Sequence, residues 1–297
     1  MFINHNQMAS NVANTLTSHY GNLQTSTQRL SSGLRVNSAA DDAAGLAIRE
    51  LMRSDIAALN QGVRNANDAI SLLQTADGAL GVIDEKLVRM KELAEQAATG
   101  TYDSTQRLMI ESEYQAMASE ITRIANSTDF NNIKLLDGNL SAEKHDGSKL
   151  KAEGKLKVHF GSANDSAEDY YYIQIGTSTA SALGVGNQAT KFSDESDART
   201  VSTLEAAQKA LVGINNAIVS KDKIRAHLGA LQNRFENTIS NLTTQAENLQ
   251  AAESRISDVD VATEMTQFVR NQILTQSAVA MLSQANSMPQ MAMQLIG

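Results

Sequence analysis

The chain has 297 residues, a formal net charge of −8 and aromatic side chains at only 4% of positions, with no Trp, no Cys and one Pro, Pro289. The negative charge excludes general nucleic-acid binding, which needs clustered Lys and Arg, and the lack of Cys excludes disulfides and thiolate metal sites. A core of Leu, Ile, Val, Met and Ala with almost no helix breaker predicts long, closely packed helices.

The amino terminus has neither a basic stretch nor an apolar core, so a cleaved secretory signal peptide is not expected. No run of about 18 apolar residues occurs, which argues against insertion into a membrane. Composition alone therefore predicts a cytosolic helical protein.

Three zones follow one another along the chain. Residues 1–138 are expected to be helical, 139–200 to be mixed and rich in turns, and 201–297 to be helical again. This order predicts a mainly α fold, in which two arms form a long antiparallel coiled-coil rod and a small β-hairpin region lies between them.

The two ends of the chain are almost free of charge. Arg29 is the only formally charged residue from 1 to 34, and none occurs from 271 to 297. Each end nevertheless has a helical stripe of apolar residues, so we expect poor order in a monomer and folding on burial against copies of the chain. The alternative is a pair of terminal helices in a closed bundle. The candidate self-assembly residues are Val12, Leu16, Leu23, Ile273, Val279 and Leu282.

The next segment has the clearest periodicity. From Val63 to Ala97, apolar residues recur at steps of three and four, with one extra step of three after Leu73. This pattern predicts a coiled-coil seam with a stammer. A turn near Gly100 and a second helix over 110–124 should follow.

The middle zone contains two short β-type segments. Residues 156–160 and 170–175 are rich in β-branched and aromatic side chains, and polar residues separate them. They predict a small β-hairpin, with loop up to Arg199.

The carboxyl arm repeats the helical pattern from 201 to 259. An unbroken helix of this length would run roughly 90 Å at about 1.5 Å per residue. A coiled-coil rod, rather than a compact domain, needs such a helix.

No motif predicts catalysis, a cofactor or a metal. The five His are scattered, and the Gly-containing stretch 184–189 lacks the strand–helix context of a dinucleotide loop. Asp258 and Asp260 lack the Gly and Glu of a calcium loop. Asp41 and Asp42 are expected to start a helix.

Several long motifs resemble those of bacterial flagellins. The amino-terminal one is LSSGLRVNSAADDAAGLAI over 30–48, and the carboxyl half matches with LGALQNRF over 228–235, RISDVDVATEM over 255–265 and MLSQANSMPQ over 281–290. The chain therefore resembles a short flagellin without the large hypervariable outer domains, across roughly 1–138 and 201–297.

This resemblance implies a division into layers. Residues 1–44 and 257–297 would form an inner-tube domain, 45–138 and 201–256 a rod domain, and 139–200 a short variable region. The terminal helices would pair in the assembled filament. The spoke between tube and rod would use the signature residues Leu34, Arg35, Asn37, Asp41, Asp42 and Gly45.

The resemblance also implies how the chain is exported and assembled. The chain would be a structural subunit, not an enzyme, exported through the flagellar type III gate with a chaperone on its carboxyl-terminal helix. It would then self-polymerise outside the cell into the flagellar filament for swimming, next to cap and hook-associated junction proteins. Export through that gate uses no cleaved signal, which revises the cytosolic prediction.

A receptor epitope is implied as well. The family's site for the flagellin-sensing Toll-like receptor corresponds to Arg89, Leu93 and Glu113, and Arg89 and Leu93 are four apart on one helix face. The alternative interpretation is that Arg89 and Glu113 are solvated rod charges that help to pack neighbouring protofilaments.

Two other functions compete with a filament subunit. A hook–filament junction protein would share the terminal motifs, although the full run over 30–48 and the closing motif favour a flagellin. A membrane-active amphipathic protein would need Lys and Arg on its polar faces, which the ends lack.

Overall fold

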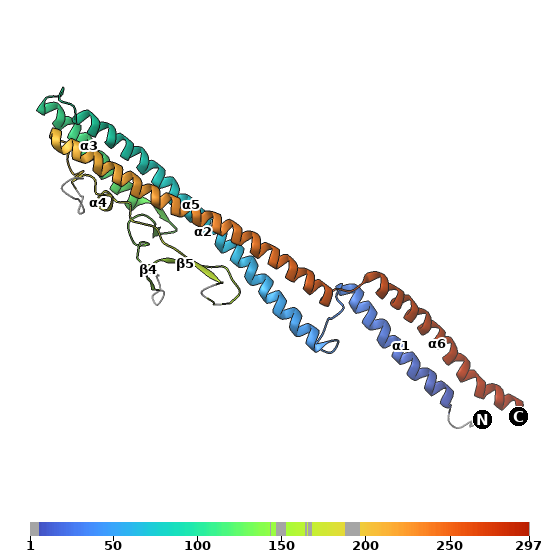
Figure 1. Ribbon diagram of the computed structural model, residues 1–297. Coiled ribbons are helices and arrows are strands. Elements are labelled where there is room, and N and C mark those ends of the chain that lie inside the picture. The colour runs from blue at the N-terminus through green and yellow to red at the C-terminus, as the bar shows by residue number, and fades with distance from the viewer. Residues whose placement is uncertain are drawn as a thin grey trace. The chain divides into compact units, whose positions relative to one another are not determined.

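The computed structural model describes residues 6–142, 144–146, 153–163, 165, 168–187 and 197–296, and these residues form two compact units. One unit combines both ends of the chain, within 1–56 and 246–297, and the other consists of residues within 57–245. Each is mainly helical, as predicted (Figure 1). Within the described ranges, no helix is long and apolar enough to cross a membrane.

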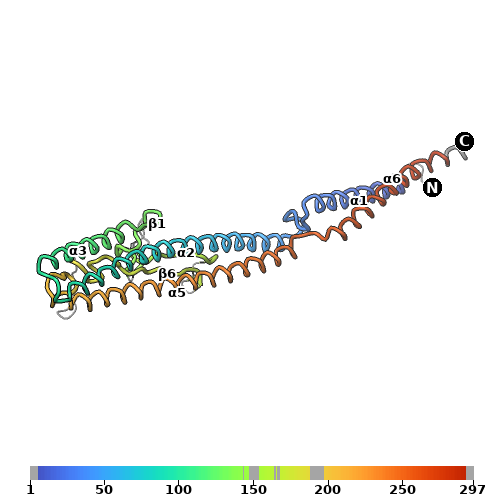
Figure 2. The backbone as a smooth tube through the Cα atoms, turned by 90° about the horizontal axis from the view of Figure 1, so that it is seen from above, coloured from blue at the N-terminus to red at the C-terminus, as the bar shows by residue number. Residues whose placement is uncertain are grey.

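Helix α1 (Gln7–Ser32) lies beside helix α6 (Val261–Ile296), as both views show (Figures 1 and 2). The two helices are antiparallel. At one end the side chain of Asn6 donates to the carbonyl of Ala285 over 2.8 Å, and at the other Arg29 Nη1 lies 3.8 Å from Glu264 Oε2. Asn6 also caps α1 by accepting from the Ala9 amide over 3.0 Å, which satisfies one of the free amides at the start of the helix.

Two helices of more than fifty residues have most of their length in the second unit. Helix α2 covers Ala43–Ala97 and α5 covers Leu204–Ser257 without a break, so the prediction of long helices here is confirmed. The predicted stammer is wrong. Ala69, not Ile70, is buried, and the buried seam of α2 keeps regular steps of three and four through Ala66, Ala69, Leu73, Ala76, Leu80, Ile83, Leu87, Met90, Ala94 and Ala97. The sequence pattern favoured Ile70 because it is the larger apolar residue beside a small seam residue, Ala69.

Ion pairs fix how α2 and α5 are aligned. Lys221 is almost completely buried, and its Nζ lies 2.5 Å from Asp84 Oδ1 and 2.7 Å from Asp222 Oδ1. One turn later, Arg225 Nε lies 2.7 Å from Asp77 Oδ1. A buried charge without its partner is costly, so these pairs disfavour a shifted register between the two antiparallel helices.

Helix α3 (Ser104–Ser127) begins after the predicted turn near Gly100. The backbone amide of Asp103 donates to Gln106 Oε1 over 3.0 Å at its start. Tyr114 is buried in the middle of the helix, and its hydroxyl donates to the Ala198 carbonyl over 2.7 Å. Burial raises the pKa of Tyr114 well above its usual value, so this hydroxyl stays protonated at neutral pH.

The expectation that residues 1–138 are helical throughout is wrong at two places. Residues 33–42 form a loop, and β1 (Asp129–Phe130) pairs with β2 (Ile133–Lys134) after α3 ends. The turn between these strands holds Asn131 and Asn132 at φ of 50° and 63°. Consecutive left-handed residues are typical of a tight hairpin turn, and Asn tolerates this conformation. The turn was not predicted because its two-residue signal directly follows a long helical pattern.

The predicted β-hairpin is confirmed. Strand β5 (Leu156–His159) pairs antiparallel with β6 (Tyr170–Ile173). Two elements of this zone were not predicted, namely the pair of β3 (His145–Asp146) with β4 (Glu153–Gly154) and the short helix α4 (Ala180–Leu183). The predicted loop up to Arg199 lies partly outside the described residues, at 188–196.

The hairpin packs directly on α2 at a glycine. The side chain of Asn65 donates to the His159 carbonyl over 2.8 Å, and a Cβ placed on Gly62 would overlap the Phe160 carbonyl. Only a residue without a side chain allows this close approach of helix and hairpin.

Gly62→Ala is therefore expected to separate the hairpin from α2 and to cost about 1–3 kcal/mol, as overpacking usually does. Urea unfolding followed by far-UV circular dichroism, with near-UV circular dichroism for the hairpin tyrosines, measures both effects. Gly81→Ala is the control, because nothing lies within 4 Å of its new Cβ and Ala favours a helix over Gly. Equal stability of the two variants would contradict the argument.

Candidate self-assembly surfaces

Only a narrow stripe is buried between α1 and α6. Its members are mostly small, and the most buried of them are Ser26, Glu264, Thr275, Ala278 and Ala285. Small residues let two helix backbones approach closely, but they remove little apolar surface from water. The ion pair between Arg29 and Glu264 uses the only charged residue of the first 34. The pairing therefore leaves many large apolar side chains of α6 exposed.

The uncovered surface of α6 is strongly apolar. Its exposed large apolar side chains are Val261, Met265, Val269, Ile273, Leu274, Val279, Met281, Met288 and Met291. On α1, Met8 and Tyr20 are also exposed. Exposed large apolar side chains in this number on one helix mark a contact surface. No formal charge from 271 to 297 would have to be desolvated when it is covered.

The six predicted self-assembly residues fall into two groups. Val12, Leu16, Leu23 and Leu282 are half-buried in this unit. Ile273 and Val279 are 56% and 47% exposed. All six were predicted to lie on apolar stripes, but the stripe of α6 that packs within the chain runs through Thr275 and Ala278. Sequence reasoning missed this stripe because its residues are small or polar.

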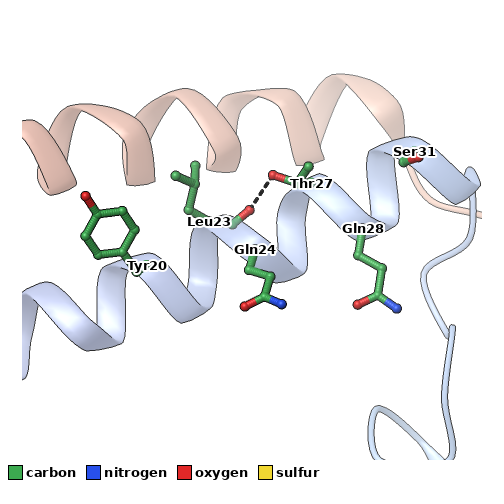
Figure 3. A pocket seen from close by; sticks show the side chains of 6 residues that line it. All are labelled: Tyr20, Leu23, Gln24, Thr27, Gln28 and Ser31. Atoms are coloured by element: carbon green, nitrogen blue, oxygen red, sulfur yellow. Dashed lines mark hydrogen bonds between the residues drawn. The ribbon is translucent and has the colours of Figure 1, made fainter.

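A shallow groove runs along α1. It has a volume of about 590 Å³ and is lined by successive turns of the helix, with Tyr20, Leu23, Gln24, Thr27, Gln28 and Ser31 (Figure 3). The Thr27 hydroxyl donates to the Leu23 carbonyl over 2.7 Å, so that polar group is already satisfied within the helix. The uncharged amide and hydroxyl groups of the groove suit contact with another neutral helix.

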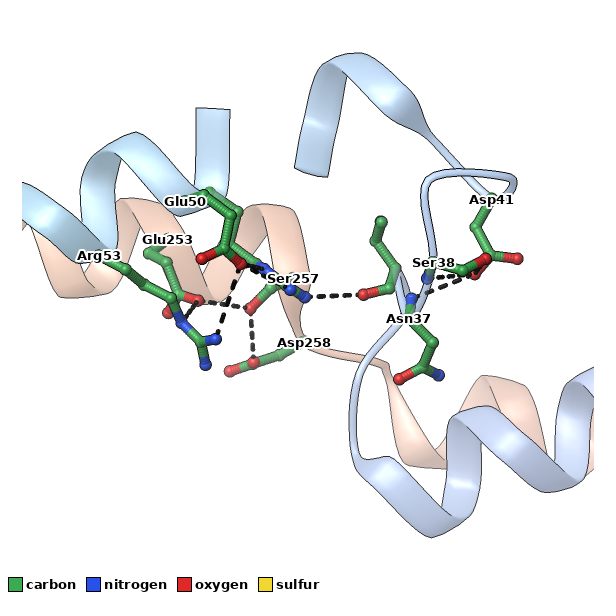
Figure 4. A network of polar contacts seen from close by, with 10 residues as sticks. Asn37, Ser38, Asp41, Glu50, Arg53, Glu253, Ser257 and Asp258 are labelled. Carbon is green, nitrogen blue, oxygen red and sulfur yellow. Dashed lines mark hydrogen bonds and ion pairs between the residues drawn. The ribbon is translucent and has the colours of Figure 1, made fainter. Parts of the chain in front are cut away.

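The loop between α1 and α2 is tied to the end of α5 (Figure 4). The Arg35 amide donates to the Ser257 carbonyl over 2.6 Å, and the Val259 amide donates to the Gly33 carbonyl over 3.0 Å. The Arg35 guanidinium donates to the Ile256 carbonyl over 2.7 Å. The loop and the α5–α6 junction thus form one hydrogen-bonded structure.

Ionic contacts strengthen this structure on the side of α2. Arg53 Nε lies 3.3 Å from Glu253 Oε1, and the Ser257 hydroxyl donates to the same oxygen over 3.1 Å. Arg49 is buried and donates to the Val36 carbonyl over 2.8 Å. Both Arg side chains therefore connect α2 to the loop or to the end of α5.

The structure brings the six signature residues together in this loop and at the start of α2. Asn37 donates to the Leu34 carbonyl over 3.2 Å, and Asp42 accepts from the Gly45 amide over 2.9 Å. A Cβ on Gly45 would overlap the Asp42 carboxylate. The expectation that Asp42 starts a helix is confirmed, because α2 begins at Ala43.

Asp41 organises the loop through its carboxylate. Its Oδ2 accepts from the amides of Asn37 and Ser38 over 3.1 and 3.0 Å. Hydrogen bonds from the Ser38 amide and then the Asn37 amide hold the pKa of Asp41 below its ordinary value of 3.8. Because the folded-state pKa is lowered, this stabilisation is complete above the ordinary value and is lost as the pH falls through the folded-state pKa.

The Asn37 and Ser38 amide resonances are therefore expected to titrate together, with a midpoint below the ordinary pKa of a free Asp. A pH series of NMR spectra on the isotope-labelled full chain measures this. Asp41→Asn should remove the titration, since the amide side chain carries no charge. A midpoint at or above the ordinary value would contradict the role given to Asp41.

The three predicted receptor residues are only partly together at the surface. Arg89 Nη2 lies 2.8 Å from Glu113 Oε1, and both side chains are exposed. Hydrogen bonds from Arg89 to Glu113 and then to Glu92 raise the pKa of Arg89. Leu93 is 1% exposed. Four residues turn a helix roughly 40° past one full rotation, which is enough to place Leu93 in the core.

Within the described part of the chain, no three His, Asp or Glu side chains are grouped so that they could hold a metal ion. The Gly-containing stretch that begins at Gly184 follows α4, where Gly184 ends the helix in the left-handed conformation with φ of 76°. It therefore serves as a helix terminator.

Comparison with known proteins gives a consistent match over most of the chain. The family model described as the bacterial flagellin N-terminal helical region matches residues 3–141, and the bacterial flagellin C-terminal helical region matches residues 211–296. The chain is similar to the flagellar filament 33 kDa core protein of Treponema phagedenis, with 41% identity over 296 residues and full coverage of both chains. It is 42% identical over 309 residues to the flagellin of Bacillus subtilis (strain 168), again with full coverage of both.

A solved structure is also similar. The crystal structure of Bacillus cereus flagellin aligns with 28% sequence identity and a TM-score of 0.45, and the alignment covers 64% of this chain and 94% of that one.

Proposed function

The chain belongs to the bacterial flagellin family and is a structural subunit of the flagellar filament, and we propose that the exposed apolar faces of α1 and α6 are the surfaces on which it polymerises. This assignment rests on the two family models and on full-length relatives at about 40% identity. As a filament protein it is exported from the cell and serves swimming motility.

The observation that carries the proposal is the uncovered apolar surface of α6. Fully burying one large apolar side chain contributes about 1.5–3 kcal/mol, and α6 leaves nine exposed from Val261 to Met291. Contacts with neighbouring copies would recover much of this free energy. The charge-free stretch from 271 onward lets them do so without desolvating ions.

The proposed layers follow the same logic. Residues 1–44 and 257–297 form the inner tube and spoke, 45–138 and 201–256 the rod, and 139–200 the variable region. The hydrogen-bonded loop around Arg35, Asn37 and Asp41 supports a spoke, because it joins α1 to the α5–α6 junction through backbone groups.

The exposed apolar side chains of α6 also suggest which proteins bind the chain before it assembles. A flagellar export chaperone would cover the apolar face of α6, and the type III export gate would pass the chain unfolded. The absence of Cys suits such passage. Cap and hook-associated junction proteins would then meet the subunit at the two ends of the filament.

Recognition by the flagellin-sensing Toll-like receptor is proposed at Arg89 and Glu113. Their exposed ion pair of 2.8 Å supports a surface that a receptor reaches on the folded rod, whereas the burial of Leu93 leaves it a packing role there. A receptor-reporter assay with Arg89→Ala and Glu113→Ala, beside Arg123→Ala as a control with an exposed ion pair on α3, tests this division. Loss of signalling only with a polar Leu93 variant would contradict it.

The competing assignment is a hook–filament junction protein. Shearing filaments from the cells and resolving them by gel electrophoresis distinguishes the two, because a filament subunit must be the dominant band and a junction protein a minor one. Negative-stain microscopy of the purified chain after seeding with sheared fragments should show elongating filaments. A minor band together with no elongation would overturn the assignment.

A further inference from the structure

Helix α6 contains a proline in its interior. Pro289 is the only Pro of the chain, and α6 continues through it. Proline has no amide hydrogen, so the carbonyl of Ala285, four residues earlier, loses the donor that an α-helix normally supplies. Because Ala285 is only 5% exposed, its carbonyl needs a donor from within the protein.

The side chain of Asn6, at the start of α1, is that donor. Its Nδ2 donates to the Ala285 carbonyl over 2.8 Å, and its Oδ1 accepts from the Ala9 amide over 3.0 Å. One carboxamide thus serves a free amide at the start of α1 and the carbonyl that Pro289 leaves free in α6. Among the usual cap residues Ser, Thr, Asp and Asn, only Asn carries a donor and an acceptor on separate atoms.

The other contacts between α1 and α6 fix their alignment less strictly. The buried stripe of α6 runs through small residues such as Thr275 and Ala278, and contacts between small apolar groups are not directional. The ion pair of Arg29 with Glu264 is 3.8 Å long, and both of its side chains are flexible. The hydrogen bond from Asn6 to Ala285, in contrast, forms in one register only.

We propose that Asn6 and Pro289 act as a matched pair that sets the register in which α1 and α6 pair. Pro289 frees one carbonyl in α6, and Asn6 reaches it only when α1 begins opposite Ala285. A slip of one turn, roughly 5.4 Å, would leave that carbonyl buried without a donor, which is unfavourable. A single polar residue fixes the register of some coiled coils in a similar way.

The register determines how the exposed side chains of this unit are arranged. The position of Met8 and Tyr20 along α1, relative to Val279 on α6, follows from it. The inference goes beyond polymerisation, because it concerns how one chain aligns its own two ends. It can therefore be tested whether or not these faces form the filament contacts.

Pulsed electron paramagnetic resonance on the full chain measures the register directly. The chain has no natural Cys, so Gln28→Cys and Ser277→Cys give two unique spin-label sites, both exposed. Gln28 adjoins Arg29, which pairs with Glu264, and Ser277 lies several turns further along α6. A slip along the helix axis therefore changes the distance between the two labels.

The labels are measured in the soluble chain and in seeded filaments in which labelled subunits are diluted by unlabelled chain. We expect one narrow distance in the natural sequence, in at least one of the two states. Asn6→Asp keeps an acceptor for the cap but removes the donor, and it should add a second, displaced population. The ratio of native to displaced distances should fall about tenfold, equivalent to about 1.4 kcal/mol.

Pro289→Ala is the sharper test. Ala favours a helix far more than Pro does, so a role of Pro289 in helix stability alone predicts a distance at least as narrow as in the natural chain. The matched pair predicts the opposite result. With an amide restored at position 289, the Ala285 carbonyl is satisfied in every register, and a displaced population should appear as it does in Asn6→Asp.

Two matched controls should keep the single narrow distance. Asn14→Asp adds the same charge at an exposed position of α1, and Ser287→Ala favours the helix near Pro289 without supplying a new donor. Far-UV circular dichroism checks the helix content of each variant. A broad distance in the natural chain in both states, an unchanged distance in either Asn6→Asp or Pro289→Ala, or equal broadening in the controls would each overturn the proposal. Failure of the natural chain to elongate would instead count against the proposed polymerising surfaces and leave the register to be read in the soluble chain.

Discussion

Replacing both Ile273 and Val279 with Asp is expected to abolish seeded polymerisation while leaving the unpolymerised chain folded. Both side chains are about half exposed, so the substitutions remove little packing within the chain. In the polymer the same positions would be covered, and each buried carboxylate would cost several kcal/mol. Light scattering after addition of sheared filament seeds measures elongation, and far-UV circular dichroism measures helix content.

The matched control is the double variant Ile273→Leu and Val279→Leu, which keeps the surface apolar and should elongate at a rate close to that of the natural chain. Deletion of 271–297 should abolish elongation as the Asp variant does. Normal elongation of the Asp variant would show that the chain polymerises through other surfaces, and it would contradict the assignment of the α6 face.

Phe235→Ala is expected to cause the largest loss of stability by a single side chain in the residues within 57–245. Phe235 is fully buried in α5, and its ring meets that of Tyr171 at 5.8 Å. Truncation of a buried Phe to Ala typically costs about 3–5 kcal/mol, from lost apolar burial and from the cavity that remains. Urea unfolding gives the free energy, and the near-UV signal of the tyrosines shows whether the hairpin is released first.

Leu108→Ala provides the control, because Leu108 is 60% exposed near the start of α3 and its truncation should change the free energy of unfolding by less than about 0.5 kcal/mol. A loss at Phe235 no larger than at Leu108 would show that the hairpin does not contribute to the packing of α5.

The helical part of the fold could be predicted from the sequence because its apolar periodicity extends over many turns. The seam from Ala66 to Ala97 repeats over many turns, so one misplaced residue, Ile70, changed the predicted register without changing the predicted helix. The hairpin of β5 and β6 was visible for the same reason: three consecutive Tyr and alternating Val and Leu give a β signal that does not compete with a helical period.

Short turns and single close contacts could not be predicted from the sequence. The turn at Asn131 and Asn132 rests on two residues in a left-handed conformation, a signal too brief to stand out beside a helix. Glycine at position 62 is required by the carbonyl of Phe160, a contact nearly one hundred positions away that no local pattern predicts. Long-range packing decides such positions.

The candidate self-assembly surfaces could likewise be predicted only in part from the sequence. The sequence revealed charge-free ends and several of their apolar residues, including Ile273 and Val279. It did not reveal which stripe of α6 packs against α1, because Thr275, Ala278 and Ala285 carry little apolar signal. Close packing of helices selects small residues, and hydrophobic periodicity underestimates them.

Amide hydrogen exchange on the full chain, measured before and after seeded polymerisation, tests most directly whether α1 and α6 are the polymerising surfaces. We predict that peptides from 7–32 and 261–291 gain strong protection on assembly. Peptides from 73–94, whose seam residues are already buried within the chain, should change far less. Unchanged exchange in both terminal helices, in filaments that elongate normally, would contradict the account.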